Sequence, residues 1–245
     1  MTDRVTREAD RRRRRPTKTG VTLDEKMIVD TALRMLEQHG PAGLSTRRLG
    51  RALGADHTAL YRYFRGMDDL ELALTDELIN RVTENWHPTG DWKADLYRWG
   101  LSAHAVYMQY PQAAMISATR ISGRPAELAA VDRILGLLRN AGFSDRHTVM
   151  YYECFTTQML SYAAWDGARK LMPGRNQEAD IRRWQNIYAR VSPDHYPNIA
   201  ATAQHIAQLG ARNAYPLALR ILIAGMQATL EHPGTSPTTV TGRSK

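Results

Sequence analysis

The sequence predicts an all-α protein, in which a small N-terminal helix-turn-helix domain of three helices precedes a larger helical domain. Apolar residues recur at helical spacing through most of residues 22–232, and neither strand-like alternation nor a glycine-rich phosphate loop is found. The chain has 245 residues, of which 43% are hydrophobic and 24% are charged. This composition is ordinary for a soluble globular protein with a large core, and it excludes a wholly disordered chain.

The first expected helix begins at Thr22. The segment Thr22-Leu23-Asp24-Glu25 has the form of a capping box, in which Thr22 is the N-cap and Glu25 reaches back to it. Gly40-Pro41 ends the helix. Its apolar residues follow at helical spacing: Val29, Ala32, Leu33 and Leu36.

Two short helices are expected next, over residues 46–53 and 57–64, with a tight turn at Gly54 between them. Ser45 and Asp56 are expected as their N-caps. Two short helices joined by such a turn are typical of a helix-turn-helix, whose second helix enters the major groove of DNA.

Helix geometry assigns the faces of the second short helix. Leu60 and Phe64 are expected to face the core, which places Thr58 and Arg62 on the opposite face. Arg62 can donate two hydrogen bonds to guanine, and Thr58 can contact a base edge or a thymine methyl group. The remaining aromatic residues, Tyr61 and Tyr63, lie at the flanks, where they suit phosphate oxygens unless they are partly buried.

Further helices are expected along the rest of the chain. The ranges are 68–86, 91–109, 112–118, 125–140, 145–171 and 212–231, with one or two more between 177 and 209. The segments 149–165 and 217–230 are apolar nearly all round, so they need burial on more than one side. A four-helix bundle between two subunits would bury them, and deep burial within one subunit is the alternative.

The charge is concentrated at the N-terminus. Residues 1–67 hold 15 basic and 8 acidic residues, whereas the rest of the chain is nearly neutral. Within that part, residues 1–21 hold 8 basic and 3 acidic residues, including the run Arg11 to Arg15. This segment is expected to be a disordered basic arm that attracts nucleic acid, or a solubilising tail without defined contacts.

Aromatic and methionine residues are frequent between residues 86 and 165, which favours a site for a bulky, apolar or planar ligand. Stripes of this kind are more often plain core, so these residues are candidates. His104 and Glu153 are polar positions in apolar stretches that can orient a ligand or occupy satisfied surface positions. The candidate ligand-binding residues are Trp99, His104, Tyr107, Tyr152, Glu153, Phe155 and Met159.

The segments Ser45 to Ala55 and Ala59 to Gly66 closely resemble the DNA-binding domain of the tetracycline-repressor (TetR) family. The resemblance is specific over residues 22–74. It implies DNA contacts from the first short helix and from the recognition helix, made by Thr46, Arg47, His57, Thr58, Tyr61, Arg62 and Tyr63. Independently, the start of the first short helix can offer backbone N–H groups and a positive dipole end to a phosphate. The family usually has Lys at the position of Met67, so one phosphate anchor is absent.

The resemblance also implies a homodimer that reads a pseudo-palindromic operator in double-stranded DNA and a C-terminal domain that binds a small-molecule effector. We expect a bacterial repressor that the effector releases from DNA, acting in the cytoplasm and at the nucleoid when bound. No apolar run is long enough to cross a membrane. The expected domains are the arm (1–21), the helix-turn-helix domain (22–67), the ligand-binding and dimerisation domain (68–232) and a disordered tail (233–245).

An enzyme and an architectural DNA-binding protein are the two other function classes. An enzyme is not expected, because no catalytic spacing motif appears and catalysis would leave the helix-turn-helix unexplained. No cofactor or metal is expected either, since the single Cys154 and the His residues lack zinc-ligand spacing. The remaining alternative is an architectural, weakly sequence-specific DNA binder that relies on its Arg-rich arm and has no physiological ligand.

Overall fold

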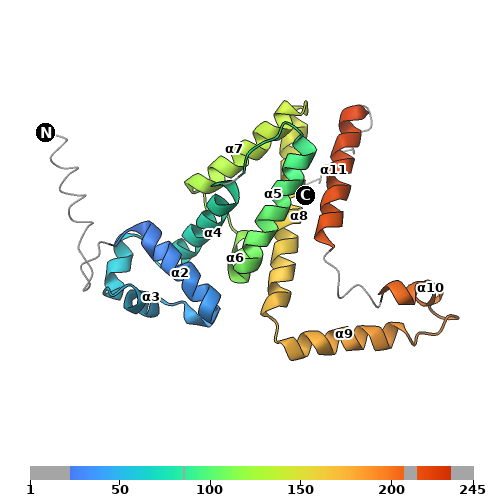
Figure 1. Ribbon diagram of the computed structural model, residues 1–245, viewed down its shortest axis with the longest axis horizontal. Helices are drawn as coiled ribbons and strands as arrows, with labels where there is room; N and C mark the ends of the chain where they lie inside the picture. Colours follow the sequence, from blue (N-terminus) through green and yellow to red (C-terminus); the bar gives the residue numbers. More distant parts are fainter. Residues whose placement is uncertain (1–22, 85, 207–213, 233–245) are drawn as a thin grey trace, which may run out of the picture. The chain divides into compact units, whose positions relative to one another are not determined.

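The protein is all-α, as predicted. The computed structural model describes residues 23–84, 86–206 and 214–232, and within them every regular element is an α-helix or a short 3-10 helix (Figure 1). In chain order these are α2 (Glu25–His39), η1 (Pro41–Gly43), α3 (Thr46–Ala52), η2 (His57–Arg62), α4 (Met67–Glu84), α5 (Trp92–Gln109), α6 (Pro111–Ser117), α7 (Pro125–Asn140), α8 (Asp145–Leu171), α9 (Gly174–Tyr188), α10 (Pro197–Ile206) and α11 (Tyr215–Glu231). In these ranges we find no helix with the length and apolarity that a membrane span requires.

Helix α2 begins at Glu25, and its N-cap is Asp24 instead of the expected Thr22. The Asp24 carboxylate accepts a hydrogen bond from the Met27 amide at 2.7 Å. A carboxylate at this position also complements the positive end of the helix dipole, which favours Asp24 over a hydroxyl further away. Thr22 itself lies outside the described residues. The predicted end is confirmed: Gly40, with φ of 64°, donates its amide to the Leu36 carbonyl.

The two short helices begin at the predicted N-caps, but the second has a different geometry from the one expected. The Ser45 hydroxyl accepts from the Arg48 amide, and the Asp56 carboxylate accepts from the Thr58 amide. The first helix is α-helical, whereas the second, η2, is a 3-10 helix that ends at Arg62. A six-residue element forms few i to i−4 bonds, so the tighter 3-10 geometry is accessible to it.

The chain divides into two compact units, and helices α5, α7 and α8 each contribute residues to both. The described part of unit 1 comprises residues up to His87, Ser102–Asp132 and Leu160–Lys170. The described part of unit 2 comprises Pro88–Leu101, Arg133–Met159 and residues from Leu171 onward. The domain limits expected from the sequence, with a division after residue 67, stay a prediction, and the expected arm and tail lie outside the described residues.

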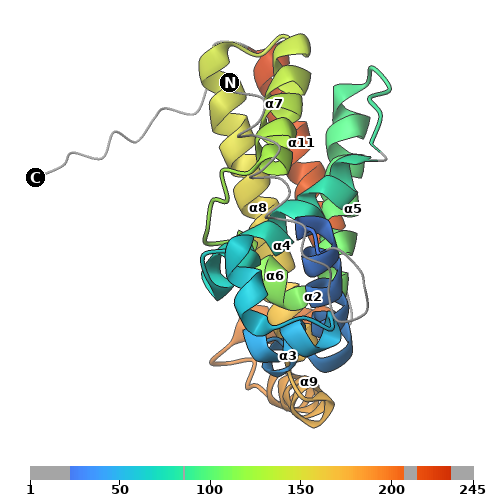
Figure 2. The same ribbon diagram turned by 90° about the vertical axis from the view of Figure 1, so that its left-hand side faces the viewer.

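Unit 1 has one hydrophobic core that runs from the helix-turn-helix into the elements that follow it. Figure 2 shows α2, α3, α4 and α6 gathered around this core. Leu49 and Leu60 of the short helices and Leu74 of α4 belong to the same cluster as Ala114 of α6. The helix-turn-helix is therefore not packed on its own, since its core is continuous with that of α4 and α6.

In unit 2, α5 approaches α8 and α11 closely at Gly100. A Cβ atom there would lie 2.7 Å from Leu219 Cδ2, 2.7 Å from the Tyr215 hydroxyl and 3.4 Å from Phe155 Cε2. Glycine at this position therefore allows α5 to pack against both α8 and α11. Further along α11, the Tyr151 hydroxyl donates to Thr229 Oγ1 at 2.6 Å and joins α8 to α11.

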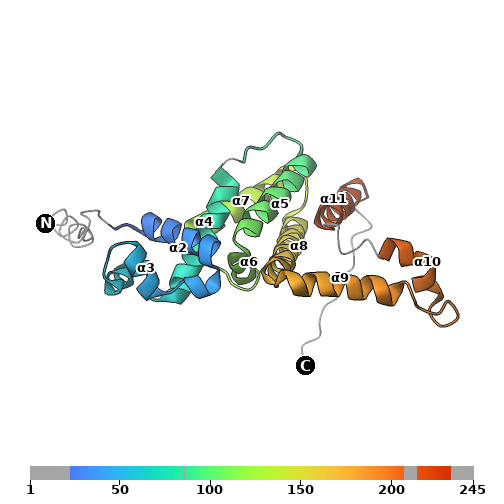
Figure 3. The same ribbon diagram turned by 60° about the horizontal axis from the view of Figure 1, so that its bottom comes forward.

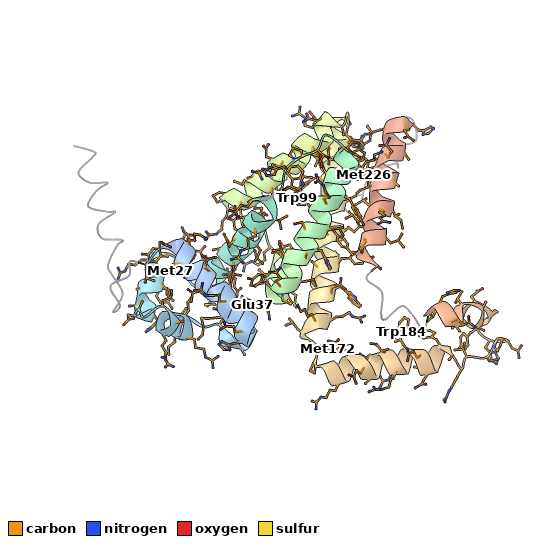
Figure 4. The ribbon with its side chains drawn as sticks, viewed as in Figure 1. Met27, Glu37, Trp99, Met172, Trp184 and Met226 are labelled. Atoms are coloured by element: carbon orange, nitrogen blue, oxygen red, sulfur yellow. The ribbon has the colours of Figure 1, made fainter. Side chains whose placement is uncertain are left out.

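Helices α9 and α10 of unit 2 bury no residue in the single chain. Figure 3 shows α9 leading on to α10. Several large apolar side chains around α9 are exposed, among them Met172 and Trp184, both labelled in Figure 4.

Candidate nucleic-acid interface and effector region

The candidate nucleic-acid interface is built on the close packing of α3 against η2. At Gly50 of α3, a Cβ atom would lie 3.0 Å from both N and Cα of His57 and 3.1 Å from the Ala55 carbonyl oxygen. The absence of a side chain therefore lets the backbone at the start of η2 approach α3 directly. This close approach fixes the angle at which η2 is presented.

Buried apolar side chains hold η2 from behind. Leu60 and Phe64 are buried in the core of unit 1, as the spacing of the sequence predicted. Thr58, Tyr61 and Arg62 are exposed on η2, with 54% of the Tyr61 surface accessible. The outer face of η2 thus combines a hydroxyl, an aromatic ring and a guanidinium, which are groups that bind base edges and phosphates.

The structure gives two members of the predicted contact set additional roles. The Thr58 hydroxyl donates to the Asp56 carboxylate at 2.8 Å, which restrains its rotamer and leaves its methyl group and its oxygen lone pairs for other partners. The Tyr63 hydroxyl donates to the Leu23 carbonyl at 2.5 Å and ties the end of η2 to the start of α2. Tyr63 is half-buried, in agreement with the partly buried alternative.

The first short helix contributes less defined groups. Arg47 is exposed at the start of α3, and Thr46 is half-buried. The neighbouring Arg48 donates to the Ala42 carbonyl at 2.7 Å, so its guanidinium supports the loop before α3. On η2, the half-buried His57 has its Nδ1 atom 3.4 Å from Asp56 Oδ1.

Met67, which occupies the position of the absent lysine anchor, packs against the core of unit 1. It is the first residue of α4, and the two aspartates that follow it favour the positive end of the helix dipole. One of them, Asp69, accepts the Arg65 amide at 3.0 Å, which lowers the pKa of its carboxyl group, assisted by Arg124. The start of α4 is therefore fixed by acidic residues.

An ion-pair cluster that was not predicted from the sequence lies beside the recognition element. Arg124, in the loop between α6 and α7, bonds to Asp69 Oδ1 at 2.7 Å and to Glu25 Oε1 at 2.8 Å. Arg120, in the same loop, pairs with Asp68. Because these pairs join residues that are far apart in the chain, helical spacing carries no signal for them.

The candidate effector residues are divided between the two units. Trp99, Phe155 and Met159 are buried in unit 2, and Figure 4 labels Trp99 on α5 and another buried residue, Met226, on α11. On α8, Tyr152 is half-buried and Glu153 is exposed. Glu153 thus occupies a surface position, which was the alternative to a role in orienting a ligand.

His104 and Tyr107 belong to unit 1. The His104 Nε2 atom lies 2.8 Å from Asp166 Oδ2, so this buried imidazole has a carboxylate partner on α8. Tyr107 is buried, and burial raises the pKa of its hydroxyl group. His104 therefore fits a position satisfied within the protein, and Tyr107 fits a core position. Among the described residues, no group of three or more His, Cys, Asp or Glu side chains is placed to hold a metal ion.

The sequence matches two family profiles. Residues 28–74 match the profile described as "Bacterial regulatory proteins, tetR family". Residues 86–230 match "Tetracyclin repressor-like, C-terminal domain". The first match covers α3 and η2, and the second covers the helices from α5 to α11.

Curated relatives agree with these profiles. The HTH-type transcriptional repressor DrrR1 of Streptomyces coeruleorubidus is 31% identical over 144 residues, which are 58% of this chain and 52% of the relative. The Tetracycline repressor protein class C of Escherichia coli is 32% identical over 124 residues, or 50% of this chain and 56% of the relative. The matched region thus spans about half the length of these curated relatives.

Solved structures show the same fold. Apo ActR from Streptomyces coelicolor superposes with a TM-score of 0.76 at 23% identity, covering 86% of this chain and 98% of ActR. A structure described as a possible TetR family transcriptional regulator from Streptomyces coelicolor A3(2) has a TM-score of 0.70 at 27% identity, covering 84% of this chain and all of that chain.

Proposed function

Because the chain belongs to the tetracycline-repressor family of bacterial regulatory proteins, we propose that it is a dimeric, sequence-specific DNA-binding repressor. It binds a pseudo-palindromic operator in double-stranded DNA and is released by a small, bulky apolar or aromatic effector. It acts in the cytoplasm and at the nucleoid when bound.

The observation that carries the proposal is the outer face of η2. Thr58, Tyr61 and Arg62 are exposed there, whereas Leu60 and Phe64 hold the same element from behind. The rigid support reduces the side-chain and backbone entropy that is lost when the face binds DNA. Arg62 reads a guanine, Thr58 contacts a base edge, and Tyr61 contacts a phosphate.

Exposed apolar side chains on α8 and α11 support the homodimer. In unit 2, Leu217 and Ile221 are 63% and 64% exposed and lie one turn apart on α11. Val149 of α8 is also exposed, as is Trp165 further along that helix. Burial of these surfaces against a second copy removes them from water and places two recognition elements about one DNA turn or a multiple apart.

The proposed effector class rests on the aromatic and methionine content of unit 2. Trp99, Phe155 and Met159 offer polarisable apolar surface, which suits a large planar ligand. Effector binding favours a dimer form whose recognition elements are wrongly spaced, and α4 transmits the change to the DNA-binding face. Reciprocity requires that DNA weaken effector binding by the same factor.

The test is a genome-wide selection of DNA fragments bound by the full-length protein, followed by affinity measurements on the recovered sequence. We expect a shared motif with two inverted half-sites. The neighbouring genes then indicate which chemical classes to screen as effectors. Recovery of fragments without a shared motif contradicts the proposal.

Truncation of the N-terminal arm distinguishes the sequence-specific regulator from the architectural alternative. If the arm contributes about five phosphate contacts, removal of residues 1–18 should reduce the slope of log affinity against log salt by roughly 4–5. A sequence-specific regulator keeps its preference for the selected motif after this truncation, whereas an architectural binder loses it.

A further inference from the structure

We infer that Arg124 is a positioning residue for DNA recognition, which holds the recognition element through α2 and α4 without contacting DNA itself. The inference rests on the proposed function and assigns a role in it to the loop between α6 and α7. All the residues involved belong to unit 1.

Arg124 connects three parts of the DNA-binding region. Its guanidinium bonds to Glu25 at the start of α2 and to both the carboxylate and the backbone carbonyl of Asp69 near the start of α4. The same group lies 6.0 Å from the ring centroid of Phe64, the buried residue that follows η2. A planar guanidinium can bridge two carboxylates, which an ammonium group cannot do with the same geometry.

Asp69 extends this connection to the backbone of the recognition segment. One of its carboxylate oxygens accepts the Arg124 guanidinium, and the other accepts the Arg65 amide at 3.0 Å. Arg65 follows η2 by three residues. The Asp69 carboxylate therefore links Arg124 directly to the backbone just after η2.

The loop that carries Arg124 is itself held in place. The Glu127 carboxylate accepts the amides of Ser122 and Gly123, both at 2.7 Å. Asp76 of α4 accepts the Glu127 amide at 2.8 Å, so the start of α7 is attached to α4 two turns beyond Asp69. This arrangement orders the loop and offers Arg124 to its partners from a fixed position.

A direct phosphate contact is a poorer explanation of Arg124. Its side chain is only 23% exposed, and it already bonds to two carboxylates, which neutralise its charge locally. Arg62, in contrast, is exposed on the outer face of η2. Arg124 therefore acts through the parts that it connects.

The test compares Arg124→Gln and Arg124→Lys with the wild-type chain. Affinity is measured for the duplex selected by the wild-type protein and for a scrambled duplex of equal length. Both variants should lose about 3- to 30-fold in affinity for the selected duplex, with little change for the scrambled one. Arg139→Gln is the matched control, because Arg139 forms an exposed ion pair with Asp145 in unit 2. This variant should bind both duplexes like wild type.

Glu25→Gln keeps the test valid if loss of Arg124 impairs folding. Glu25 is about half exposed, so its replacement should leave the melting temperature nearly unchanged while reducing affinity for the selected duplex in the same direction. The double variant Glu25→Gln/Arg124→Gln should bind the selected duplex with the same affinity as Arg124→Gln, within the measurement error, because the two residues share one interaction.

If Arg124→Gln weakened binding to both duplexes equally and Arg124→Lys bound both like wild type, the effect would be one of non-specific charge, and the inference would be overturned. Unchanged affinity of Arg124→Gln for the selected duplex would also overturn it and leave the proposed function intact. If the wild-type protein selects no motif, the proposed function fails first, and the two failures are thereby distinguished.

Discussion

The DNA-binding region of unit 1 and the α8/α11 surface of unit 2 differ in what they leave exposed. On η2 the exposed side chains include Arg62 and Thr58, and the apolar residues beneath them are buried. On α11 the exposed side chains include Leu217 and Ile221, which are apolar. Exposed polar side chains above buried apolar ones suit a highly charged, hydrated partner such as DNA. Exposed apolar side chains on a long helix suit the surface of another protein.

The two regions also differ in how their backbone is held. The short helices of unit 1 depend on the Ser45 and Asp56 caps, because few of their backbone groups have partners within the helix. Helix α8 has 27 residues and satisfies most of its backbone groups internally. We therefore expect binding specificity to depend on local side-chain geometry in unit 1, and assembly to depend on apolar area in unit 2.

The largest expected effect comes from placing charge on the apolar surface of unit 2. Leu217→Glu/Ile221→Glu should convert the dimer into a monomer, because four carboxylates would meet across the interface without partners. Loss of the second half-site should then reduce affinity for the selected duplex by about 10²- to 10⁴-fold. Sedimentation and titration of the duplex measure the two effects.

Leu128→Glu is the matched control for this surface. Leu128 is 60% exposed on α7, so glutamate there should leave both assembly and affinity unchanged. A Leu217→Glu/Ile221→Glu chain that remains dimeric would show that another surface holds the subunits together.

A smaller effect is expected at the close approach of helices in unit 2. Gly100→Ala should lower the free energy of unfolding by about 1–3 kcal/mol, because the new methyl group overlaps Leu219 and Tyr215, both fully buried. Gly136→Ala on α7 is the control, since nothing lies within 4 Å of its Cβ position. It should be neutral or stabilising by up to about 1 kcal/mol. Urea unfolding that gave both variants the same stability would contradict the packing assigned to Gly100.

Arg62→Ala tests the reading role of the outer face of η2. Discrimination at one base pair of each half-site should fall by about 1–3 kcal/mol, because a bidentate contact to guanine is lost. The measurement is a set of affinities for duplexes with single base-pair changes. If affinity instead falls uniformly for all duplexes, Arg62 contacts a phosphate.

The two tyrosines beside Arg62 should respond differently to loss of the hydroxyl group. Tyr63→Phe should lower the free energy of unfolding by about 1 kcal/mol, since the bond to the Leu23 carbonyl is removed. Tyr61→Phe should leave stability unchanged and weaken binding to all duplexes, because Tyr61 is exposed and suits a phosphate. Urea unfolding and duplex titration separate the roles, and equal behaviour of the two variants would contradict this division.

The smallest expected effect is the pH dependence of Asp69. Hydrogen bonding by the Arg65 amide, assisted by Arg124, lowers the pKa of this carboxyl group in the folded protein. Its contribution to stability is therefore complete well above its unfolded pKa of about 3.9 and is lost as pH falls through the folded pKa. Asp69→Asn should be less stable than wild type near neutral pH by up to about 1 kcal/mol. The difference should shrink below about pH 4, and a difference that stays constant to lower pH would contradict the ionised pair.

Most features that depend on neighbouring residues were predictable from the sequence, although the N-cap of α2 is Asp24 and not the predicted Thr22. The Ser45 and Asp56 caps and the buried positions of Leu60 and Phe64 follow from side-chain chemistry and helical period, and the structure confirms them. The 3-10 geometry of η2 was not predictable, because 3-10 and α-helices share much of their sequence preference.

Features that depend on residues far apart in the chain could not be found in the same way. Arg124 contacts Glu25 and Asp69, and a charged residue in a loop gives no sign of which carboxylates it will meet. Helical spacing did place Trp99 and Tyr107 on one face of α5, and both are buried there, although they belong to different units. The candidate effector residues and the DNA contacts therefore stay predictions.

The central claim, that a dimer reads two inverted half-sites, is tested most directly by hydroxyl-radical footprinting of the selected duplex, with sedimentation of the same complex. We predict two equally protected half-sites whose centres lie about 34–36 Å or a multiple of that apart, with an even number of chains on each duplex. A single protected half-site bound by one chain, or uniform protection along the duplex, would contradict it.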